Sequence, residues 1–438
     1  GLARLLAVGA LPLVSACGDE AAGPDGTPAA NNGGGGALTG TAGSGVALAG
    51  SAGAPVTSGG AAGGTVGGAS PAGGVNSTAG VTSMGGAATA GAAGMSLGGA
   101  SGGSAGAAGS AGAAGSAGAA GSGGGGNSSG TDCNSVTGQT VVTVGPSATF
   151  KTVQAALNSL SKTNTTPTQI RIAPGTYKEK LTVQIPNITL CGQAGKASTT
   201  ILTYSDNANT SNGNGGTLGT TGGASTNITA SNVSAENLTF ANSTPIGGSQ
   251  AVALLVSGDQ VQFRNRRFLS FQDTLYVRKA KQYFRDCYIE GTVDFIFGDA
   301  TAVFQDCTVH NVSGGTAATA PNTDQSLAYG LVFLGGELTA ASSISAGSIA
   351  LGRNWGAYGA AAYIQTKLGA HIKPAGWVPM GTNTLDTARF SEYKTTGPGA
   401  SASAIAARAS QSKQLTDQQA ANYTLAKIFG AWVPSFSK

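Results

Sequence analysis

Short apolar runs alternate with polar turns through the middle of the chain and repeat about every 20 residues. Two sets of residues show this spacing: Phe263, Phe284 and Phe304, then Asn265, Asp286 and Asp306. The runs are rich in β-branched and aromatic residues, and Gly, Asn or Asp separate them, which indicates strands and turns. A repeat of this length predicts a β-solenoid, in which coils stack and equivalent residues form columns. The pattern therefore predicts an all-β fold with one shared core.

The hydrophobic spacing changes from strand-like to helical at both ends of this region. Phe150, Val153, Leu157 and Leu160 have helical spacing and predict a short amphipathic helix. We expect this helix to cap the first coil, because an uncapped solenoid exposes its core and strand edges. Residues 415–429 are also helical by pattern, and we expect this tail to pack along the side of the solenoid.

Polar residues interrupt the apolar runs at positions that stability alone would not favour. Gln250 and Gln272 are 22 residues apart, and Asp273 and Asp294 are 21 apart. Because neighbouring strands lie about 4.8 Å apart, we expect the two aspartates to stack one coil apart. Two carboxylates at that distance do not both ionise easily, so one becomes an acid and the other an anionic nucleophile. The alternative is a solvated pair on a sheet surface, but the two nearby glutamines favour a catalytic site.

A second polar position follows the apolar run near residue 351. Arg353 and Trp355 lie in the segment Leu-Gly-Arg-Asn-Trp, and we expect Arg353 to form a bidentate pair with one of the two aspartates. The two histidines, His310 and His371, have no nucleophile nearby in sequence and are expected to be structural.

Composition divides the 438 residues into three parts. Residues 1–17 carry a positive charge, a short apolar run and the sequence Val-Ser-Ala-Cys, which is similar to a bacterial lipobox ending at Cys17. Residues 18–132 are Gly, Ala, Ser and Thr with almost no aromatic residues, and are expected to form a disordered tether. Residues 133–438 are long enough for one solenoid domain. Because residue 1 is Gly rather than Met, we expect the natural start to lie further upstream. The predicted protein is exported, and is either lipid-anchored to a membrane through Cys17 or secreted.

Residues 145–435 resemble the pectin methylesterases, a carbohydrate esterase family with a right-handed parallel β-helix. The resemblance rests on these blocks: Thr149-Phe-Lys-Thr-Val-Gln-Ala-Ala, Gly175-Thr-Tyr-Lys-Glu, Gln250-Ala-Val-Ala, Gln272-Asp-Thr-Leu-Tyr, Asp294-Phe-Ile-Phe-Gly, Leu351-Gly-Arg-Asn-Trp and Phe390-Ser-Glu-Tyr. It implies an all-β, right-handed parallel β-helix that hydrolyses methyl esters of pectin to pectate and methanol.

The resemblance also implies a role for each polar residue of the central runs. Asp294 would attack the ester carbonyl and form an acyl-enzyme. Asp273 would protonate the departing methanol and then activate water. Gln272 and Gln250 would donate hydrogen bonds to the oxyanion, and Arg353 would orient Asp294 as an anion.

Three aromatic residues complete the implied site. Phe297, Tyr276 and Trp355 would line the cleft and pack on sugar faces; the alternative for Phe297 is plain core packing. The resemblance implies no metal and no cofactor. Asn354 departs from the family, which usually has Pro there, and should loosen the turn before Trp355.

The resemblance also bears on the cysteines. Cys287 and Cys307 lie one coil apart, and related bacterial enzymes resemble this arrangement, so a disulfide is expected between them in an exported protein. The alternative is two stacked thiols in the core. Cys133 and Cys191 are a further possible pair. Arg266 occupies the same column as Cys287 and Cys307, where a small buried residue is expected, and would need a partner.

The formal net charge of +4 and the isoelectric point near 8.8 suit an anionic polymer such as pectin. We expect a monomer with no nucleic-acid partner. Three alternatives remain open: an esterase or thioesterase of the same fold with another substrate, a non-catalytic polysaccharide-binding β-helix, and a lyase-like β-helix. The lyase would need a calcium cluster, which the sequence lacks, and only its activity should vanish in EDTA.

Overall fold

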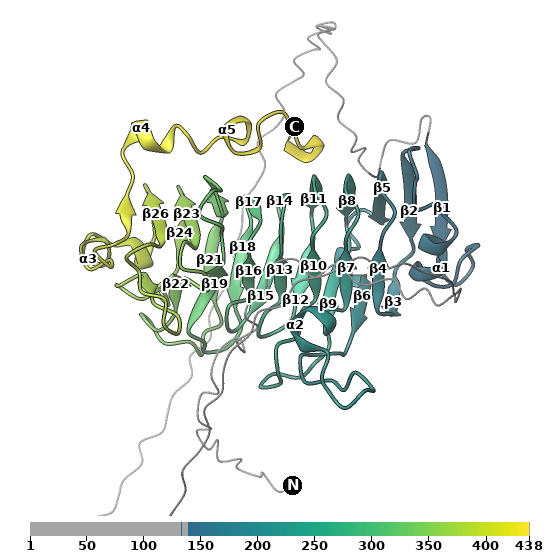
Figure 1. Ribbon diagram of the computed structural model, residues 1–438, viewed down its shortest axis with the longest axis horizontal. Coiled ribbons are helices and arrows are strands. Elements are labelled where there is room, and N and C mark those ends of the chain that lie inside the picture. Colours follow the sequence, from purple (N-terminus) through teal and green to yellow (C-terminus); the bar gives the residue numbers. More distant parts are fainter. Residues whose placement is uncertain (1–132, 134–138, 438) are drawn as a thin grey trace, which may run out of the picture. The chain divides into compact units, whose positions relative to one another are not determined.

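The computed structural model describes Cys133 and residues 139–437. Three sheets wind around one core, and every strand pairing between neighbouring coils is parallel (Figure 1). The predicted solenoid is therefore confirmed. Residues 1–17 with Cys17, and the predicted tether at 18–132, lie outside the described residues.

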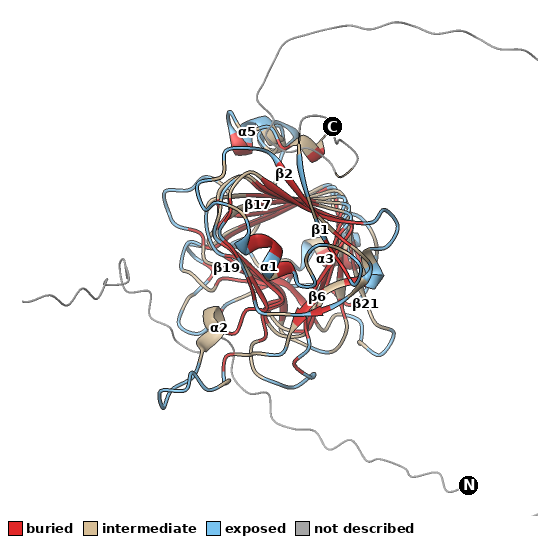
Figure 2. Ribbon diagram, turned by 90° about the vertical axis from the view of Figure 1, so that its right-hand side faces the viewer, coloured by how far each residue is buried: buried red, intermediate tan, exposed pale blue. Residues whose placement is uncertain are grey.

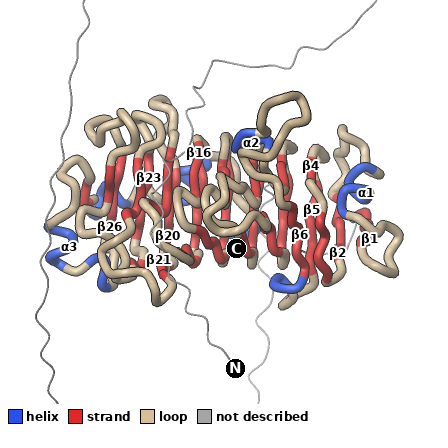
Figure 3. The backbone as a smooth tube through the Cα atoms, turned by 90° about the horizontal axis from the view of Figure 1, so that it is seen from below, coloured by secondary structure: helices blue, strands red, loops and turns tan. Residues whose placement is uncertain are grey.

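From β2 to β25 each coil contributes one strand to each sheet, and β1, β26 and β27 extend sheet A alone. Figure 3 shows the strands of successive coils side by side. Sheet A contains β1 Thr140–Val144, β2 Thr168–Ile172, β5 Ile188–Gly192, β8 Val233–Glu236, β11 Val261–Arg264, β14 Lys281–Arg285, β17 Thr301–Gln305, β20 Leu331–Leu334, β23 Ala360–Ile364, β26 Arg389–Tyr393 and β27 Lys413–Gln414. Sheet B contains β3 Gly175–Lys178, β6 Thr200–Tyr204, β9 Thr239–Asn242, β12 Arg267–Leu269, β15 Tyr288–Gly291, β18 Thr308–Asn311, β21 Glu337–Ala340 and β24 Lys367–Leu368. Sheet C contains β4 Leu181–Val183, β7 Thr226–Ile228, β10 Leu254–Val256, β13 Leu275–Val277, β16 Ile296–Gly298, β19 Ala317–Pro321, β22 Ala350–Arg353 and β25 Trp377–Val378.

The core is built from columns of identical or similar residues. Phe263, Phe284 and Phe304 pair in register on sheet A, and their rings stack with centroids 4.7 Å apart at each step. Phe333 and Tyr363 extend the stack at 4.8 and 4.4 Å. These spacings match the distance between hydrogen-bonded strands, so one residue per coil fills each layer of the core.

The polar column at the turn between sheets A and B has a conformational cause. Asn265, Asp286 and Asp306 have φ angles of 53°, 52° and 52°. Asn and Asp tolerate this left-handed conformation better than other residues with a side chain, which explains why the repeat places them there.

The N-terminal helix is shorter than the hydrophobic spacing predicts. α1 covers Val153–Asn158, because Thr152 accepts a hydrogen bond from the Ala155 amide and caps the helix start. Phe150 lies before the cap and pairs with Val144 instead. The buried face of α1 packs on the first strands, and Figure 2 shows α1 within the outline of the three sheets at this end.

The C-terminal tail crosses the outer face of sheet A (Figure 1). The predicted single helix is two short ones, α4 Asp417–Ala420 and α5 Leu425–Phe429. The break has a local cause, because Thr424 caps α5 and starts a new helix. The remaining helical elements are α2 Gly219–Gly222, α3 Ala402–Ala406, η1 Ala197–Thr199, η2 Pro398–Ala400 and η3 Ser435–Ser437. Within residues 139–437, none of the helices has the length and apolar character needed to cross a lipid bilayer.

The expected disulfide between Cys287 and Cys307 is absent from the structure, where both are buried free thiols. Their sulfurs lie near the backbone carbonyls of Arg285 and Gln305. Residues stacked in register point in the same direction and lie about 4.8 Å apart, whereas a disulfide needs Cβ atoms about 3.8 Å apart that face each other. The further possible pair is confirmed: a disulfide joins Cys133 to Cys191, with a Cα–Cα distance of 5.6 Å.

Arg266 is buried in the column that contains Cys287 and Cys307, as the repeat predicts. Its Nη2 donates to the Leu190 carbonyl at 3.0 Å. Nε and Nη1 have no hydrogen-bond partner among the described residues. Burial lowers the pKa of the Arg266 guanidinium well below its ordinary value.

Candidate active site

The two aspartates lie at equivalent positions of adjacent coils, each two residues before a strand of sheet C. Leu275 pairs with Ile296, and the Asp273 amide donates to the Val293 carbonyl at 3.1 Å. This register stacks Asp273 on Asp294, as their spacing predicts. Both residues have positive φ angles, 65° and 49°, and both side chains are fully buried. A carboxylate in such a position requires a compensating charge or hydrogen bonds.

Arg353 supplies the charge for Asp294. Its Nε donates to Oδ1 at 2.8 Å and to Oδ2 at 3.1 Å, and its Nη2 donates to Oδ2 at 2.5 Å. The register explains this contact, because Arg353 continues the row on the outer face of sheet C that contains Phe297 and Ala320. The planar guanidinium holds the carboxylate in one orientation, so its oxygens are fixed relative to the guanidinium plane.

The two glutamines lie in neighbouring coils beside the aspartates. The Ala251 amide donates to the Gln272 carbonyl at 3.1 Å, which places Gln250 one coil before Gln272. Both side chains are half-buried, unlike the carboxylates. Gln250 Oε1 accepts a hydrogen bond from Ser249 at 2.6 Å. That bond turns the Gln250 amide nitrogen away from Ser249, so the amide can act as a donor elsewhere.

The three predicted aromatic residues meet on the outer face of sheet C, and we call this group the aromatic shelf (Tyr276, Phe297 and Trp355). Tyr276 and Phe297 pair in register and stack at 4.3 Å. Trp355 approaches both rings, at 6.1 and 5.9 Å between centroids. These residues form a cluster apart from the main core, so Phe297 lies outside the solenoid interior. Phe297 and Tyr276 are nevertheless buried, at 1% and 7% exposed, and Trp355 is the half-buried member of the shelf.

Asn354 anchors the turn that carries Trp355. Its side chain is fully buried, and its Nδ2 donates to the Thr384 carbonyl at 2.6 Å. Asn383 Nδ2 donates to the Trp355 carbonyl at 2.7 Å. The Asn354 amide thus forms a cross-link that Pro could not form, while the expectation that Asn354 loosens the turn relative to Pro stays a prediction.

Small polar residues that the repeat does not single out support the site. Ser270 donates to the Ala251 carbonyl at 2.6 Å, and Thr274 donates to the Glu290 carbonyl at 2.8 Å. These bonds fix the segment that carries Gln272 and Asp273 to both neighbouring coils. In the sequence, the hydroxyl residues on either side of the Gln-Asp pair could have indicated this support.

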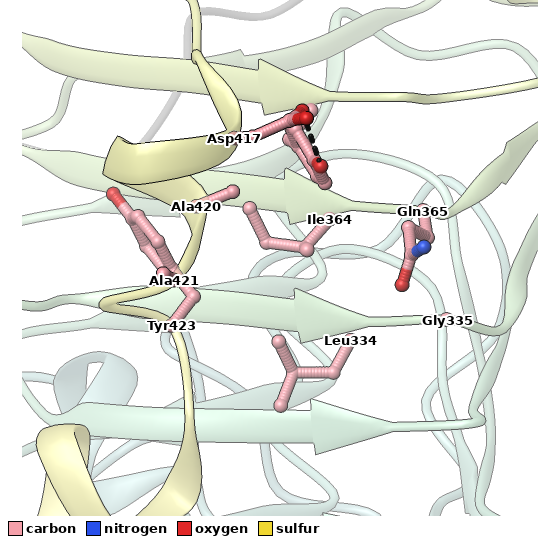
Figure 4. A pocket seen from close by; sticks show the side chains of 9 residues that line it. Leu334, Gly335, Ile364, Gln365, Asp417, Ala420, Ala421 and Tyr423 are labelled. Atoms are coloured by element: carbon pink, nitrogen blue, oxygen red, sulfur yellow. Dashed lines mark hydrogen bonds between the residues drawn. The ribbon is translucent and has the colours of Figure 1, made fainter.

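A separate groove lies between the C-terminal tail and sheet A (Figure 4). Its volume is about 360 Å³, and Leu334, Ile364 and Tyr423 are among its lining residues. Its one carboxylate, Asp417, accepts a hydrogen bond from Tyr393 at 2.7 Å. The groove lies on a different sheet from Asp273 and Asp294 and holds no carboxylate pair, so we assign the chemistry to sheet C. No three His, Cys, Asp or Glu side chains within the described part of the chain are grouped to hold a metal ion.

Comparisons with known proteins agree with this geometry. The family model described as Pectinesterase matches residues 139–431. The chain is 37% identical to Pectinesterase 31 of Arabidopsis thaliana over 288 residues, which cover 63% of this chain and 87% of that protein. It is 35% identical to Pectinesterase A of Dickeya chrysanthemi over 337 residues, which cover 66% of this chain and 88% of that protein.

Solved structures give the same result. A pectin methylesterase in complex with a hexasaccharide matches with a TM-score of 0.60 and 31% identity, over 67% of this chain and 98% of that one. The pectin methylesterase from carrot matches with a TM-score of 0.62 and 33% identity, over 68% of this chain and 96% of that one.

Proposed function

As a member of the pectinesterase family, the chain is a carboxylic ester hydrolase, and we propose that it removes methyl esters from pectin through an acyl-enzyme on Asp294. The observation that carries the proposal is the buried ion pair between Asp294 and Arg353, with Asp273 stacked one coil away. A similar protein binds a hexasaccharide, which supports an oligosaccharide substrate here. The half-buried Gln250, Gln272 and Trp355 form the part of the site that a polymer can reach.

The first half of the reaction forms the acyl-enzyme. An oxygen of the Asp294 carboxylate attacks the carbonyl carbon of the methyl ester, and the carbonyl π electrons move to oxygen. The amide N–H groups of Gln250 and Gln272 donate hydrogen bonds to this oxyanion. When the oxyanion collapses, the C–OCH₃ bond breaks, and the Asp273 proton passes to the departing oxygen to give methanol.

The second half releases the acid. Asp273 is now a carboxylate and takes a proton from water, which attacks the carbonyl carbon of the mixed anhydride. The Asp294 carboxylate leaves and returns to Arg353, and the galacturonate carboxyl group is free. Asp273 is protonated again, so the site is ready for another ester. Both aspartates therefore take part in both halves of the reaction.

Methanol release from highly methylated pectin tests this proposal. Asp294→Asn should lower kcat by about 10³-fold or more, and Asp273→Asn by about 10²- to 10⁴-fold, because each change removes one chemical step. Asn tolerates the positive φ at both positions. Asp294→Asn leaves the buried Arg353 without its carboxylate partner, so the melting temperature of each variant is measured to check that it folds. Asp286→Asn, which changes an exposed aspartate at the turn between sheets A and B, is the matched control and should retain activity. Full activity of Asp294→Asn would reject the assigned nucleophile, and an inactive, folded wild type would reject pectin as the substrate.

We also propose that the protein is exported and lipid-anchored through Cys17. Support comes from the sequence, in which a positive charge, a short apolar run and Val-Ser-Ala precede Cys17. Cys17→Ser should move the esterase from the detergent phase to the aqueous phase in a phase-partition experiment, with unchanged kcat. Equal partitioning of both proteins would contradict the anchor. We expect the catalytic domain to act as a monomer, which its sedimentation would test.

A further inference from the structure

A row of polar residues follows the sheet C strands on which the aromatic shelf lies. Arg278, Asp299 and Asn322 come directly after β13, β16 and β19. Gly298 pairs with Pro321, and the Asn322 amide donates to the Gly298 carbonyl at 2.9 Å, so Asp299 and Asn322 are neighbours across coils. The Arg278 amide donates to the Val256 carbonyl at 2.8 Å and keeps the same register. Successive members of the row are therefore about 4.8 Å apart along the backbone.

Contacts place this row at the border of the aromatic shelf. A Cβ atom on Gly298 would lie 3.1 Å from the Tyr276 ring, so the residue before Asp299 packs closely on the shelf. On the other side, a Cβ atom on Gly356 would lie 2.0 Å from Asn322 Oδ1. Gly356 directly follows Trp355, so Asn322 packs beside the third member of the shelf. Asp299 lies between these two contacts.

Asp299 is a half-buried carboxyl group with one direct side-chain hydrogen bond. Asn322 Nδ2 donates to its Oδ1 at 3.1 Å. Burial is the main cause that raises the pKa of Asp299, and Asp324 adds to it, whereas the hydrogen bond from Asn322 and the charge of Arg278 lower it; the net pKa is about 6. Residues 354–359, which pack on Asn322 through Gly356, contain no charged residue. The group is therefore an anion above about pH 6.

Arg278 carries the positive charge in this row, opposite in sign to Asp299. Its side chain is exposed, and among the described residues its guanidinium has no hydrogen bond or ion pair. It acts on Asp299 only through space. An exposed guanidinium is well suited to bind a carboxylate of a ligand, because its planar donors match the two oxygens.

We propose that Asp299 and Arg278 determine which sugars the enzyme accepts next to the reacting ester. Asp299 selects against a free galacturonate on the aromatic shelf and favours a methyl-esterified one, whereas Arg278 binds a free galacturonate carboxylate one coil away. This inference rests on the proposed function, because it requires a partly esterified galacturonate polymer as substrate. An ester is neutral and a free galacturonate is an anion, so a single fixed charge discriminates between them by Coulomb energy alone.

The test compares kcat/KM for methanol release from a highly methylated pectin and from a partly de-esterified pectin, near pH 8. The measured quantity is the ratio of the second value to the first. Asp299→Asn should raise this ratio about three- to tenfold, and Arg278→Gln should lower it by a similar factor, as expected for one charge near the surface. Asp286→Asn, with the same loss of charge at the turn between sheets A and B, should leave the ratio unchanged. Asn keeps an oxygen that can accept from Asn322, so Asp299→Asn should fold normally, and its melting temperature checks this.

Acid pH gives a second readout. Near pH 5 the ratio for wild type should approach that of Asp299→Asn, because Asp299 is then largely protonated. An equal ratio for wild type and Asp299→Asn at both pH values would overturn the role of Asp299. An unchanged ratio for Arg278→Gln would overturn the role of Arg278. A wild type that releases no methanol from either pectin would overturn the proposed function, and this inference with it.

Discussion

At the scale of single residues, the site depends on a charge that the fold buries. Asp294 has no exposed surface, and Arg353 is only 7% exposed. A buried ion pair of this kind contributes little net stability, but the loss of one partner leaves the other charge without compensation. The pair therefore adds little to the stability of the solenoid, and the orientation it gives Asp294 agrees with the nucleophile role that we propose.

Changes at Arg353 should separate charge from geometry. Arg353→Gln removes the charge and should lower kcat by about 10²-fold or more. It should also destabilise the fold by about 3–5 kcal/mol, because Asp294 remains buried without its partner. Arg353→Lys keeps the charge but loses the bidentate contact, so we expect an intermediate kcat and a smaller loss of stability. Methanol release and urea unfolding measure the two effects, and equal kcat values for Gln and Lys variants would contradict the importance of charge.

His371 should make the stability of the domain depend on pH. Burial lowers the pKa of its imidazole to about 4, and His310 adds a repulsion of the same sign. The unfolded chain binds this proton near pH 6.5, so the free energy of unfolding should fall as the pH drops from about 6.5 to about 4. The stability that His371 contributes is fully present above pH 6.5.

In the variant His371→Gln the side chain at this position stays neutral. Its free energy of unfolding should therefore decrease by up to about 2–3 kcal/mol less than that of wild type between pH 6.5 and pH 4. Urea unfolding at pH 7 and at pH 4 measures the free energy of unfolding of wild type and of the variant. If both proteins lose the same stability between these pH values, His371 does not titrate as described.

At the scale of elements, the repeat is readable in the sequence because each coil needs the same residue types at the same step. The Phe column and the Asn/Asp column follow from core packing and from a left-handed turn, and both are periodic. The stacking of Asp273 on Asp294 follows from the same period. Elements outside the repeat are less predictable. Thr152 and Thr424 set helix starts through single capping bonds, which hydrophobic spacing does not indicate.

The cysteines show the same limit. The repeat places Cys287 and Cys307 in one column, yet the bonded pair is Cys133 and Cys191. Cys133 precedes the first strand of the repeat, so no periodicity indicates its position. Pairing in register places two residues at the distance between neighbouring strands, with their side chains pointing the same way. A disulfide requires two Cβ atoms that are closer and face each other.

The Cys133–Cys191 bond should stabilise the N-terminal coils. It joins residues 58 apart, so Cys133→Ser should lower the free energy of unfolding by about 2–4 kcal/mol. Urea unfolding with and without a reductant measures this. The reductant should destabilise wild type and the control Cys287→Ser, but not Cys133→Ser. A reductant effect that persists in Cys133→Ser would indicate another disulfide.

At the scale of the whole described domain, helical segments cover apolar surface at the N-terminal end of the solenoid and on the outer face of sheet A. The tail lays Ile428, Phe429 and Phe436 over Tyr283 and its neighbours on the outer face of sheet A. At the N-terminal end, α1 buries Val153, Ala156 and Leu157 against the first strands. The sequence predicts both coverings from helical spacing, although it predicts neither their exact bounds nor the break in the tail. The aromatic shelf and the polar row lie on sheet C, so the proposed site and the surface covered by the tail lie on different sheets.

The left-handed backbone at Asp273 and Asp294 has a consequence for how such a protein can change over generations. Asn fits that backbone as well as Asp does. In the genetic code the two amino acids differ by one base, so a single point mutation can remove a proposed catalytic carboxylate without straining this backbone. A duplicated copy of this gene is therefore one mutation away from a protein that holds its polymer without cutting any ester. Conversely, an inactive descendant that keeps this backbone needs only one Asn-to-Asp reversion to regain the carboxylate.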